Sequence, residues 1–196
     1  MEIVKVPSFC LALLLASVLP GWRGAVAEDR PADAAARLTD DGRLVKPMDY
    51  REWVWLSSGL GMTYGPAAPA PGQDPSFDNV FVNPRSYRAF IDSGRWPDGT
   101  IFILEIRSSV SKGSINRDGH YQSGLRAIEA EVKKDGKWTF YGFEGGNASA
   151  KAIPRSASCY GCHASNGAVD NTFVQFYPTL LEVARAKGTL KAGVAE

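Results

Sequence analysis

The chain has 196 residues, of which 44% are hydrophobic, and its 22 Lys and Arg residues nearly balance 21 Asp and Glu residues. This length fits one domain with enough chain to bury a core. The balanced charge provides no basic excess for nucleic-acid binding and no acidic tail. We therefore expect one globular domain and no nucleic acid among its partners.

Residues 1–27 have the pattern of a secretory signal peptide. Lys5 gives a basic start, and the apolar run at residues 9–16 is too short to span a membrane. Ala25-Val26-Ala27 is a small-residue cleavage site, which disfavours the alternative of an uncleaved anchor. We expect a periplasmic or secreted protein that has no membrane association after cleavage.

Residues 28–46 are rich in Ala and charge and hold few large apolar groups, so we expect a loose N-terminal segment there. A single domain is predicted over residues 47–190. Asp49 can cap a short helix, and the aromatic and β-branched run at residues 50–56 suits a strand. Residues 65–76 are rich in Pro and Gly and predict a loop.

A second strand is expected over residues 78–82. Asn83-Pro84 is a helix start, with Asn as the cap and Pro at the first helical position, and Gly94 ends this helix. Residues 100–107 are rich in Ile and Phe and make the most strand-like stretch of the chain.

The C-terminal half begins with a polar loop over residues 108–120. Residues 126–132 alternate, with Ile128, Ala130 and Val132 on one side and Glu129 and Glu131 on the other. A hairpin turn follows at residues 135–136, and residues 138–143 return as the partner strand. A last helix is predicted over residues 178–186. The fold class is therefore α+β, mainly antiparallel sheet with short flanking helices.

The stretch Cys159-Tyr160-Gly161-Cys162-His163 reads C-x-x-C-H, the attachment pattern of c-type haem. Two thiols must add to the two vinyl groups on one edge of a porphyrin, and residues three apart on a helix share a face. The imidazole that follows becomes the proximal iron ligand. We predict covalently attached haem c, held by Cys159 and Cys162, with His163 as the metal ligand.

Two other sites use similar residues. Structural zinc requires four Cys or His ligands, and outside the motif the chain offers only Cys10, within the predicted signal peptide, and His120. A thioredoxin-like redox pair belongs at the start of a helix in a βαβ unit, and no βαβ pattern precedes the motif. Haem attachment is therefore favoured over both.

Several short motifs, in order over about residues 47–187, resemble the family of cytochrome P-460 and cytochrome c′-beta. The matching pieces are Tyr50-Arg51-Glu52-Trp53-Val54, Val80-Phe81-Val82-Asn83-Pro84 with Ser86-Tyr87, Asp98-Gly99-Thr100, Glu129-Ala130 with Val132-Lys133, Trp138-Thr139-Phe140-Tyr141, the C-x-x-C-H motif, and Phe176-Tyr177-Pro178. The resemblance implies a β-rich secreted haem protein that forms a homodimer. It also implies an iron whose distal side is open to a small ligand.

One position departs from the family pattern. The lysine that crosslinks to the haem in cytochrome P-460 aligns with Leu104, which has no amine. Phe102 and Leu104 share a strand face, so an apolar wall is expected against the haem, closer to the aromatic-lined pocket of cytochrome c′-beta. We therefore expect Phe81, Phe102 and Leu104 to contact the haem. Asp78 falls where cytochrome P-460 can carry an arginine.

The axial ligands decide between three functions. An open site suits small gaseous or nitrogenous ligands such as nitric oxide, and this is the function we favour. Oxidation of hydroxylamine or nitric oxide by a haem-dependent oxidoreductase requires a base, for which Asp78, Glu105 and Glu144 are candidates. An electron-transfer cytochrome, with a redox partner protein, requires a sixth ligand. The candidates for that ligand are Met48, Met62 and His120.

Overall fold

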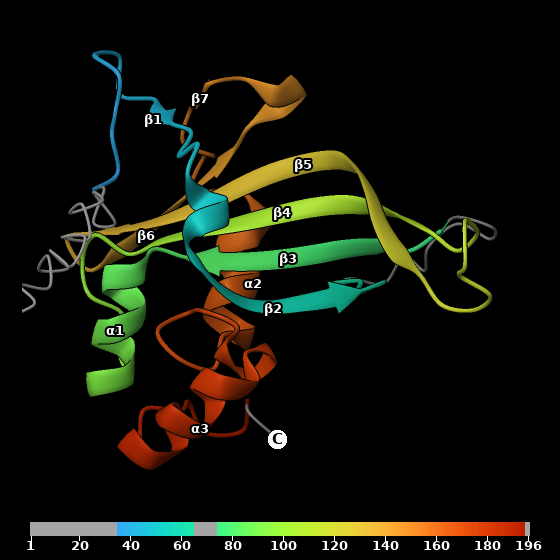
Figure 1. Ribbon diagram of the computed structural model, residues 1–196. Coiled ribbons are helices and arrows are strands. Elements are labelled where there is room, and N and C mark those ends of the chain that lie inside the picture. The colour runs from blue at the N-terminus through green and yellow to red at the C-terminus, as the bar shows by residue number, and fades with distance from the viewer. Residues whose placement is uncertain (1–34, 65–73, 195–196) are drawn as a thin grey trace, which may run out of the picture. The chain divides into compact units, whose positions relative to one another are not determined.

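The computed structural model describes residues 35–64 and 74–194 (Figure 1). The predicted signal peptide and most of the predicted Pro- and Gly-rich loop lie outside the described residues. Among the residues described, no helix is long and apolar enough to cross a membrane.

A five-stranded antiparallel sheet forms the centre, with its strands in the order β2-β3-β4-β5-β6 (Figure 1). The strands are β2 (Val54–Leu60), β3 (Ser76–Val82), β4 (Ile101–Val110), β5 (Tyr121–Lys134) and β6 (Lys137–Gly142). Two short strands, β1 (Leu44–Val45) and β7 (Ser149–Ala150), pair with each other. The predicted α+β class with a mainly antiparallel sheet is confirmed.

Local turn chemistry explains the order of the strands. Asp135 and Gly136 both have positive φ, at 51° and 68°, as a two-residue hairpin between twisted strands requires. The β4–β5 hairpin is longer, and its connection at residues 111–120 projects past the other strands (Figure 1). Consecutive strands are neighbours throughout the sheet, and the helix at residues 84–93 lies in the connection between β3 and β4.

Within the described residues, three α-helices pack around this sheet: α1 (Pro84–Ser93), α2 (Ser158–Asn166) and α3 (Pro178–Lys187). Single-turn 3₁₀ helices lie at η1 (Tyr50–Glu52), η2 (Glu144–Gly146) and η3 (Val174–Phe176). Left-handed Gly94 ends α1, as predicted, and left-handed Gly188 ends α3.

Asn83 precedes α1, but its side chain does not cap the helix. Its Oδ1 accepts a hydrogen bond of 2.9 Å from the Ile101 amide, and its Nδ2 donates to the Gly99 carbonyl at 3.2 Å. Asn83 therefore fastens the start of β4 to the start of α1, a role that the capping pattern did not predict.

Strand register divides the sheet into two faces. Val80 pairs with Leu104, which pairs with Glu129, and Val82 pairs with Phe102, which pairs with Glu131. Directly paired residues in a sheet point to the same side. These residues therefore share one face, which we call the site face, and residues one position away along each strand point to the second face.

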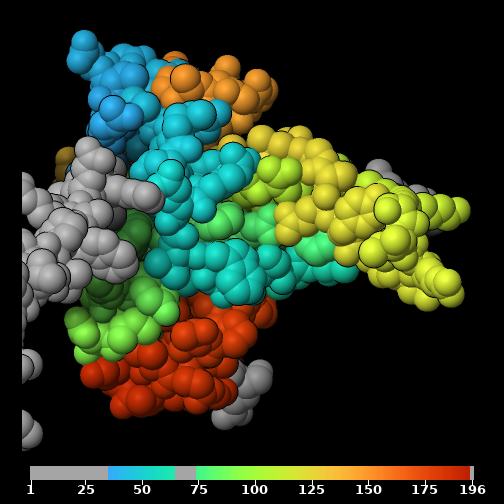
Figure 2. All heavy atoms as spheres, viewed as in Figure 1, coloured from blue at the N-terminus to red at the C-terminus, as the bar shows by residue number. Residues whose placement is uncertain are grey.

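The second face is partly covered by the segment before β2. Leu44 is fully buried there with Tyr50 and Trp53, against Ile101 and Ile103 of β4. In Figure 2 the blue to cyan residues of this segment lie beside the orange segment that contains β7. Residues 35–46 thus differ from the loose segment expected over 28–46, because a pair of short strands and a buried leucine attach them.

A buried ion-pair network lies on the second face. Glu105 is 3% exposed, and its carboxylate accepts hydrogen bonds of 2.6 Å from both Arg51 and Arg107. The Tyr50 hydroxyl also donates to it. Burial alone would raise the pKa of Glu105, but these hydrogen bonds and the two guanidinium charges outweigh it and lower the pKa. The charged carboxylate is therefore part of the fold.

We predict that Glu105→Gln lowers the free energy of unfolding by about 2 kcal/mol at neutral pH, because it weakens hydrogen bonds to a charged group. A carboxyl whose folded pKa is lowered stabilises the fold above its unfolded pKa, and this stabilisation is lost as pH falls through the folded pKa. The difference from wild type should therefore vanish in acid. Urea unfolding of both proteins at neutral and at acidic pH measures this difference in free energy.

The control is Glu144→Gln, since Glu144 is an exposed carboxylate. It should change the free energy of unfolding by less than about 0.5 kcal/mol. Equal losses for the two variants would show that the Glu105 network contributes nothing specific.

Candidate haem site

Helix α2 carries the C-x-x-C-H motif and is anchored to the sheet through Tyr160. The Tyr160 hydroxyl accepts from the Phe140 amide of β6 at 3.3 Å and donates to the Ile153 carbonyl at 3.1 Å. The Tyr160 and Phe140 rings pack edge to face, with centroids 4.6 Å apart. Cys159 and Cys162, three residues apart, are free thiols that line the cavity below α2.

The imidazole of His163 is fixed on both sides and at one nitrogen. Its ring lies between Phe140 and Phe173, with centroid distances of 4.7 and 4.4 Å. Its Nδ1 is 3.0 Å from the Asn171 carbonyl oxygen. Because a carbonyl can only accept, Nδ1 carries the proton in this hydrogen bond, and the lone pair is on Nε2.

The Nε2 atom of His163 faces Glu131, whose Oε1 is 3.4 Å away. Burial lowers the pKa of His163, although its hydrogen bond to Asn171 partly opposes this shift. The imidazole is therefore neutral at neutral pH, the form that binds a metal ion. Because Glu131 lies against Nε2, a metal ion bound to Nε2 would displace the Glu131 carboxyl from this contact.

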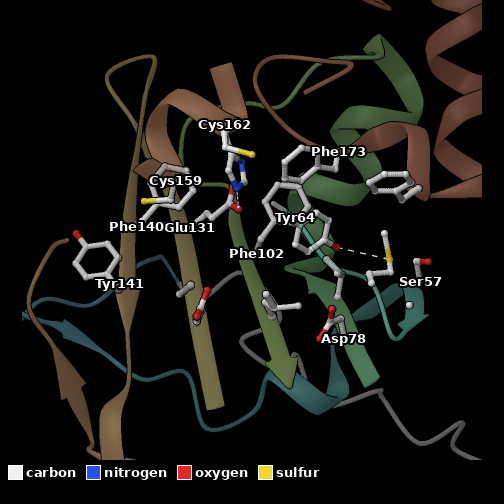
Figure 3. A pocket seen from close by; sticks show the side chains of 18 of the residues that line it. Ser57, Tyr64, Asp78, Phe102, Glu131, Phe140, Tyr141, Cys159, Cys162 and Phe173 are labelled. Atoms are coloured by element: carbon white, nitrogen blue, oxygen red, sulfur yellow. Dashed lines mark hydrogen bonds and ion pairs between the residues drawn. The ribbon is translucent and has the colours of Figure 1, made fainter. Parts of the chain in front are cut away.

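A cavity of about 380 Å³ lies between α2 and the site face of the sheet. This volume is within the range of about 300–1,000 Å³ that is typical of cofactor pockets. Figure 3 shows both cysteines at one side of the cavity and aromatic rings around it. The aromatic side chains that line it are Tyr64, Phe102, Phe140, Tyr141, Phe173, Phe176 and Tyr177.

Two of the three predicted wall residues lie in the cavity. Phe102 and Leu104, on alternate positions of β4, both line it. Phe81 does not, and the prediction for it was wrong. It pairs with Ile103 on the second face, where its ring packs against Tyr50 with centroids 5.6 Å apart. The reason is strand parity, which directs Val80 to the cavity instead.

The wall is also more acidic than expected. Asp78, Glu129 and Glu131 all line the cavity, and none of the described lining residues is Lys or Arg. Sequence reasoning placed Glu129 and Glu131 on a shared face of β5 but did not assign that face to the site. Their pairing with Leu104 and Phe102 is the signal that places them there.

Burial raises the pKa of each of these carboxyls, and for two of them the charge of Glu129 adds to this shift. For Asp78 the cause is burial, with the nearby charge of Glu129. The cavity walls likewise raise the pKa of Glu129 by desolvation. Burial and then the charge of Glu129 raise the pKa of Glu131 to about 8. Glu131 can therefore hold and release a proton near neutral pH.

The other carboxylate candidates lie elsewhere. Glu105 is on the second face, in the network described above, and Glu144 is exposed in η2. Neither lines the cavity. Of the three bases expected from the sequence, Asp78 alone reaches the site.

The three candidate sixth ligands also differ in whether they line the cavity. Met48 is 74% exposed, and His120 lies in the β4–β5 connection, 3.3 Å from the Ser109 hydroxyl. Met62 lines the cavity, and its sulfur accepts a hydrogen bond of 3.6 Å from Tyr64. Met62 is therefore the one candidate that the described structure brings to the site.

The family model for cytochrome P460 matches residues 47–174. The chain belongs to the cytochrome P460 family. A comparison with curated proteins found no match. Members of this family are haem proteins, and the resemblance found in the short motifs is confirmed.

The residues of the cavity fit a haem. Two thiols at helical spacing line the cavity, and an imidazole with its proton on the far nitrogen directs a lone pair inward. Aromatic rings supply the apolar walls that a porphyrin requires. No lysine is found among the described cavity residues, so nothing there replaces the family's crosslinking amine at Leu104.

We predict that His163→Ala, which removes the axial imidazole, gives an absorption spectrum that differs from that of the wild-type haem protein. His120→Ala is the matched control, since these are the chain's two histidines, and it should leave the spectrum unchanged. Optical and electron paramagnetic resonance spectra measure both. An unaltered spectrum in the His163 variant would contradict the assignment, and circular dichroism would show whether each variant is folded.

Proposed function

We propose that this chain carries haem c, attached through thioether bonds to Cys159 and Cys162, and binds a small uncharged ligand such as nitric oxide. The observation that carries the proposal is the direction of His163, whose Nε2 lone pair points into the cavity that the two thiols line. Bound haem supplies an iron that takes a diatomic ligand or exchanges electrons.

The chain's own residues would leave one side of the iron available. His163 provides one strong ligand, and the sequence holds no other histidine at the cavity. The Met62 thioether is a weaker ligand on a short segment after β2, where it contacts Tyr64. Phe102 and Leu104 provide an apolar surface that favours neutral ligands over hydrated ions.

We predict that the purified protein is high-spin and five-coordinate when reduced, and that nitric oxide changes its spectrum stoichiometrically. Met62→Leu should leave the ligand-free spectrum unchanged, because leucine keeps the volume and removes the sulfur. A six-coordinate low-spin spectrum in both redox states would contradict an open site. If that spectrum were lost in the Met62 variant, the protein would be an electron-transfer cytochrome.

A second function is favoured by the acidic part of the cavity. Oxidation of hydroxylamine removes protons together with electrons, so it requires a base near the reacting nitrogen. Glu129 lies opposite Leu104 on the site face, and its raised pKa suits it to accept a proton. An external acceptor would take the electrons. The protein would then be an oxidoreductase as well as a ligand-binding protein.

If this second function holds, Glu129→Gln should lower the turnover of hydroxylamine by about 100-fold or more, because general bases contribute rate factors of that order. Nitric oxide binding should persist, since it requires no proton transfer. Glu144→Gln, an exposed carboxylate outside the cavity, is the control for turnover. Absence of turnover in wild type with several electron acceptors would leave ligand binding as the function.

We also propose export to the periplasm, homodimerisation and, for the oxidoreductase, a redox partner protein. The signal-peptide pattern supports export, because thioether attachment of haem takes place outside the cytoplasm. Exposed apolar side chains on the second face support self-association, since Trp55, Leu60 and Leu125 are 58%, 46% and 46% exposed there. Exposed apolar side chains on one face can mark a protein interface.

A further inference from the structure

The loop after α2, residues 167–172, determines where the His163 imidazole points. We call it the proximal loop. Its Asn171 carbonyl accepts the Nδ1 proton of His163, so any displacement of the loop moves that acceptor. The proximal loop is also tight, since a side-chain carbon at Gly167 would lie 2.4 Å from the Asn171 backbone. The acceptor and the end of α2 are therefore in close contact.

The backbone of the proximal loop makes a tight turn through two residues in the left-handed region. Asp170 and Asn171 both have positive φ, at 49° and 61°, as the central residues of a two-residue turn require, and Asp and Asn tolerate this conformation better than other non-glycine residues. Such conformations persist where the surrounding structure enforces them, and they concentrate at functional sites. Backbone hydrogen bonds between Val169 and Thr172 close this turn from within the loop, and further contacts come from outside it.

Three side chains from the body of the protein hold Asp170 and Thr172 of the proximal loop in place. Lys133 of β5 forms an ion pair with Asp170 and donates to the Trp96 carbonyl at 2.7 Å. The Trp138 indole of β6 donates to the Asp170 carbonyl at 2.8 Å. The Trp96 indole donates to the Thr172 hydroxyl at 2.9 Å. Asn171 thus lies between two residues that are each anchored to the body of the protein.

These contacts are shielded from water. The side chain of Lys133 is 12% exposed, and Trp96 and Thr172 are each 2% exposed. The Lys133 ammonium also lies 5.7 Å from the centre of the Trp138 ring. An ion pair in such surroundings is screened less than one at the surface, so it can constrain the loop.

We propose that Lys133, Asp170 and Trp138 are positioning residues that set the electron donation of His163 to the haem iron. They keep the Asn171 carbonyl on the Nδ1 proton, and a strong hydrogen bond there makes the imidazole a better donor at Nε2. A more basic axial ligand stabilises ferric over ferrous iron and lowers the reduction potential. This inference rests on the proposed function, in which His163 binds the iron.

Lys133→Met separates this role from a simple charge effect, because the two predict opposite signs. Removal of a cation would by itself favour ferric iron and lower the midpoint potential. Loosening of the proximal loop weakens the hydrogen bond to Nδ1 and raises the potential. We therefore expect Lys133→Met to raise the midpoint potential and to lower the iron–histidine stretching frequency in the resonance Raman spectrum of the reduced holoprotein.

Three further variants complete the test. Trp138→Phe removes one hydrogen-bond donor without a change of charge, so it should shift both quantities in the same direction by less. Lys133→Arg keeps the ion pair and should restore most of the wild-type values. Lys134→Met, at an exposed lysine next along β5, should leave both quantities unchanged. If Lys133→Met fails to fold, Trp138→Phe tests the positioning role in its place.

The outcomes are distinguishable from failure of the proposed function. A wild-type protein without an iron–histidine band would remove His163 as the ligand and the inference with it. A wild-type band that stays at the same frequency in both Lys133→Met and Trp138→Phe would overturn the inference alone. A lowered midpoint potential in Lys133→Met would also overturn it, since that sign belongs to charge removal.

Discussion

The hydrogen bond from His163 Nδ1 to the Asn171 carbonyl is the constraint on which the site depends. It assigns the imidazole proton, directs the Nε2 lone pair into the cavity and ties the end of α2 to the loop that follows. The surrounding sheet makes this bond possible. Phe140 of β6 supports one side of the ring, while β5 and β6 supply the side chains that hold residues 170–172. The antiparallel sheet therefore acts as a rigid support for a helix-borne ligand.

The cavity combines two kinds of wall, and this combination decides which chemistry is open to it. Phe102 and Leu104 give an apolar surface suited to a neutral diatomic ligand, as the sequence suggested. Carboxyl groups on the neighbouring strands introduce proton acceptors whose pKa values are raised by burial. An apolar wall alone would favour ligand binding without proton transfer. A wall with carboxyls beside it can also support an oxidation that releases protons, provided that a substrate reaches the same side of the iron.

Local signals in the sequence predicted most of the elements, because they depend on neighbouring residues alone. The Asp135-Gly136 turn, the Pro84 and Gly94 boundaries of α1 and the helical spacing of the two cysteines all belong to this class. The errors came from long-range pairing. Phe81 was assigned to the wrong face, and the shared face of Glu129 and Glu131 was not assigned to the site, because the alternation of a strand gives two faces without saying which one meets a cofactor. The anchoring of the proximal loop was likewise not predicted, since Lys133 and Trp138, which bind Asp170, lie far away in the chain. The homodimer stays a prediction.

Covalent attachment of haem at one short motif is the central claim, and peptide mapping by mass spectrometry tests it most directly. The protein would be produced in a host that matures c-type cytochromes, unfolded, extracted with acidified organic solvent and digested. The account predicts one haem that survives extraction and is found on the peptide containing residues 159–163, joined to both cysteines. A polypeptide of bare mass, or a haem removed by the extraction, would contradict it.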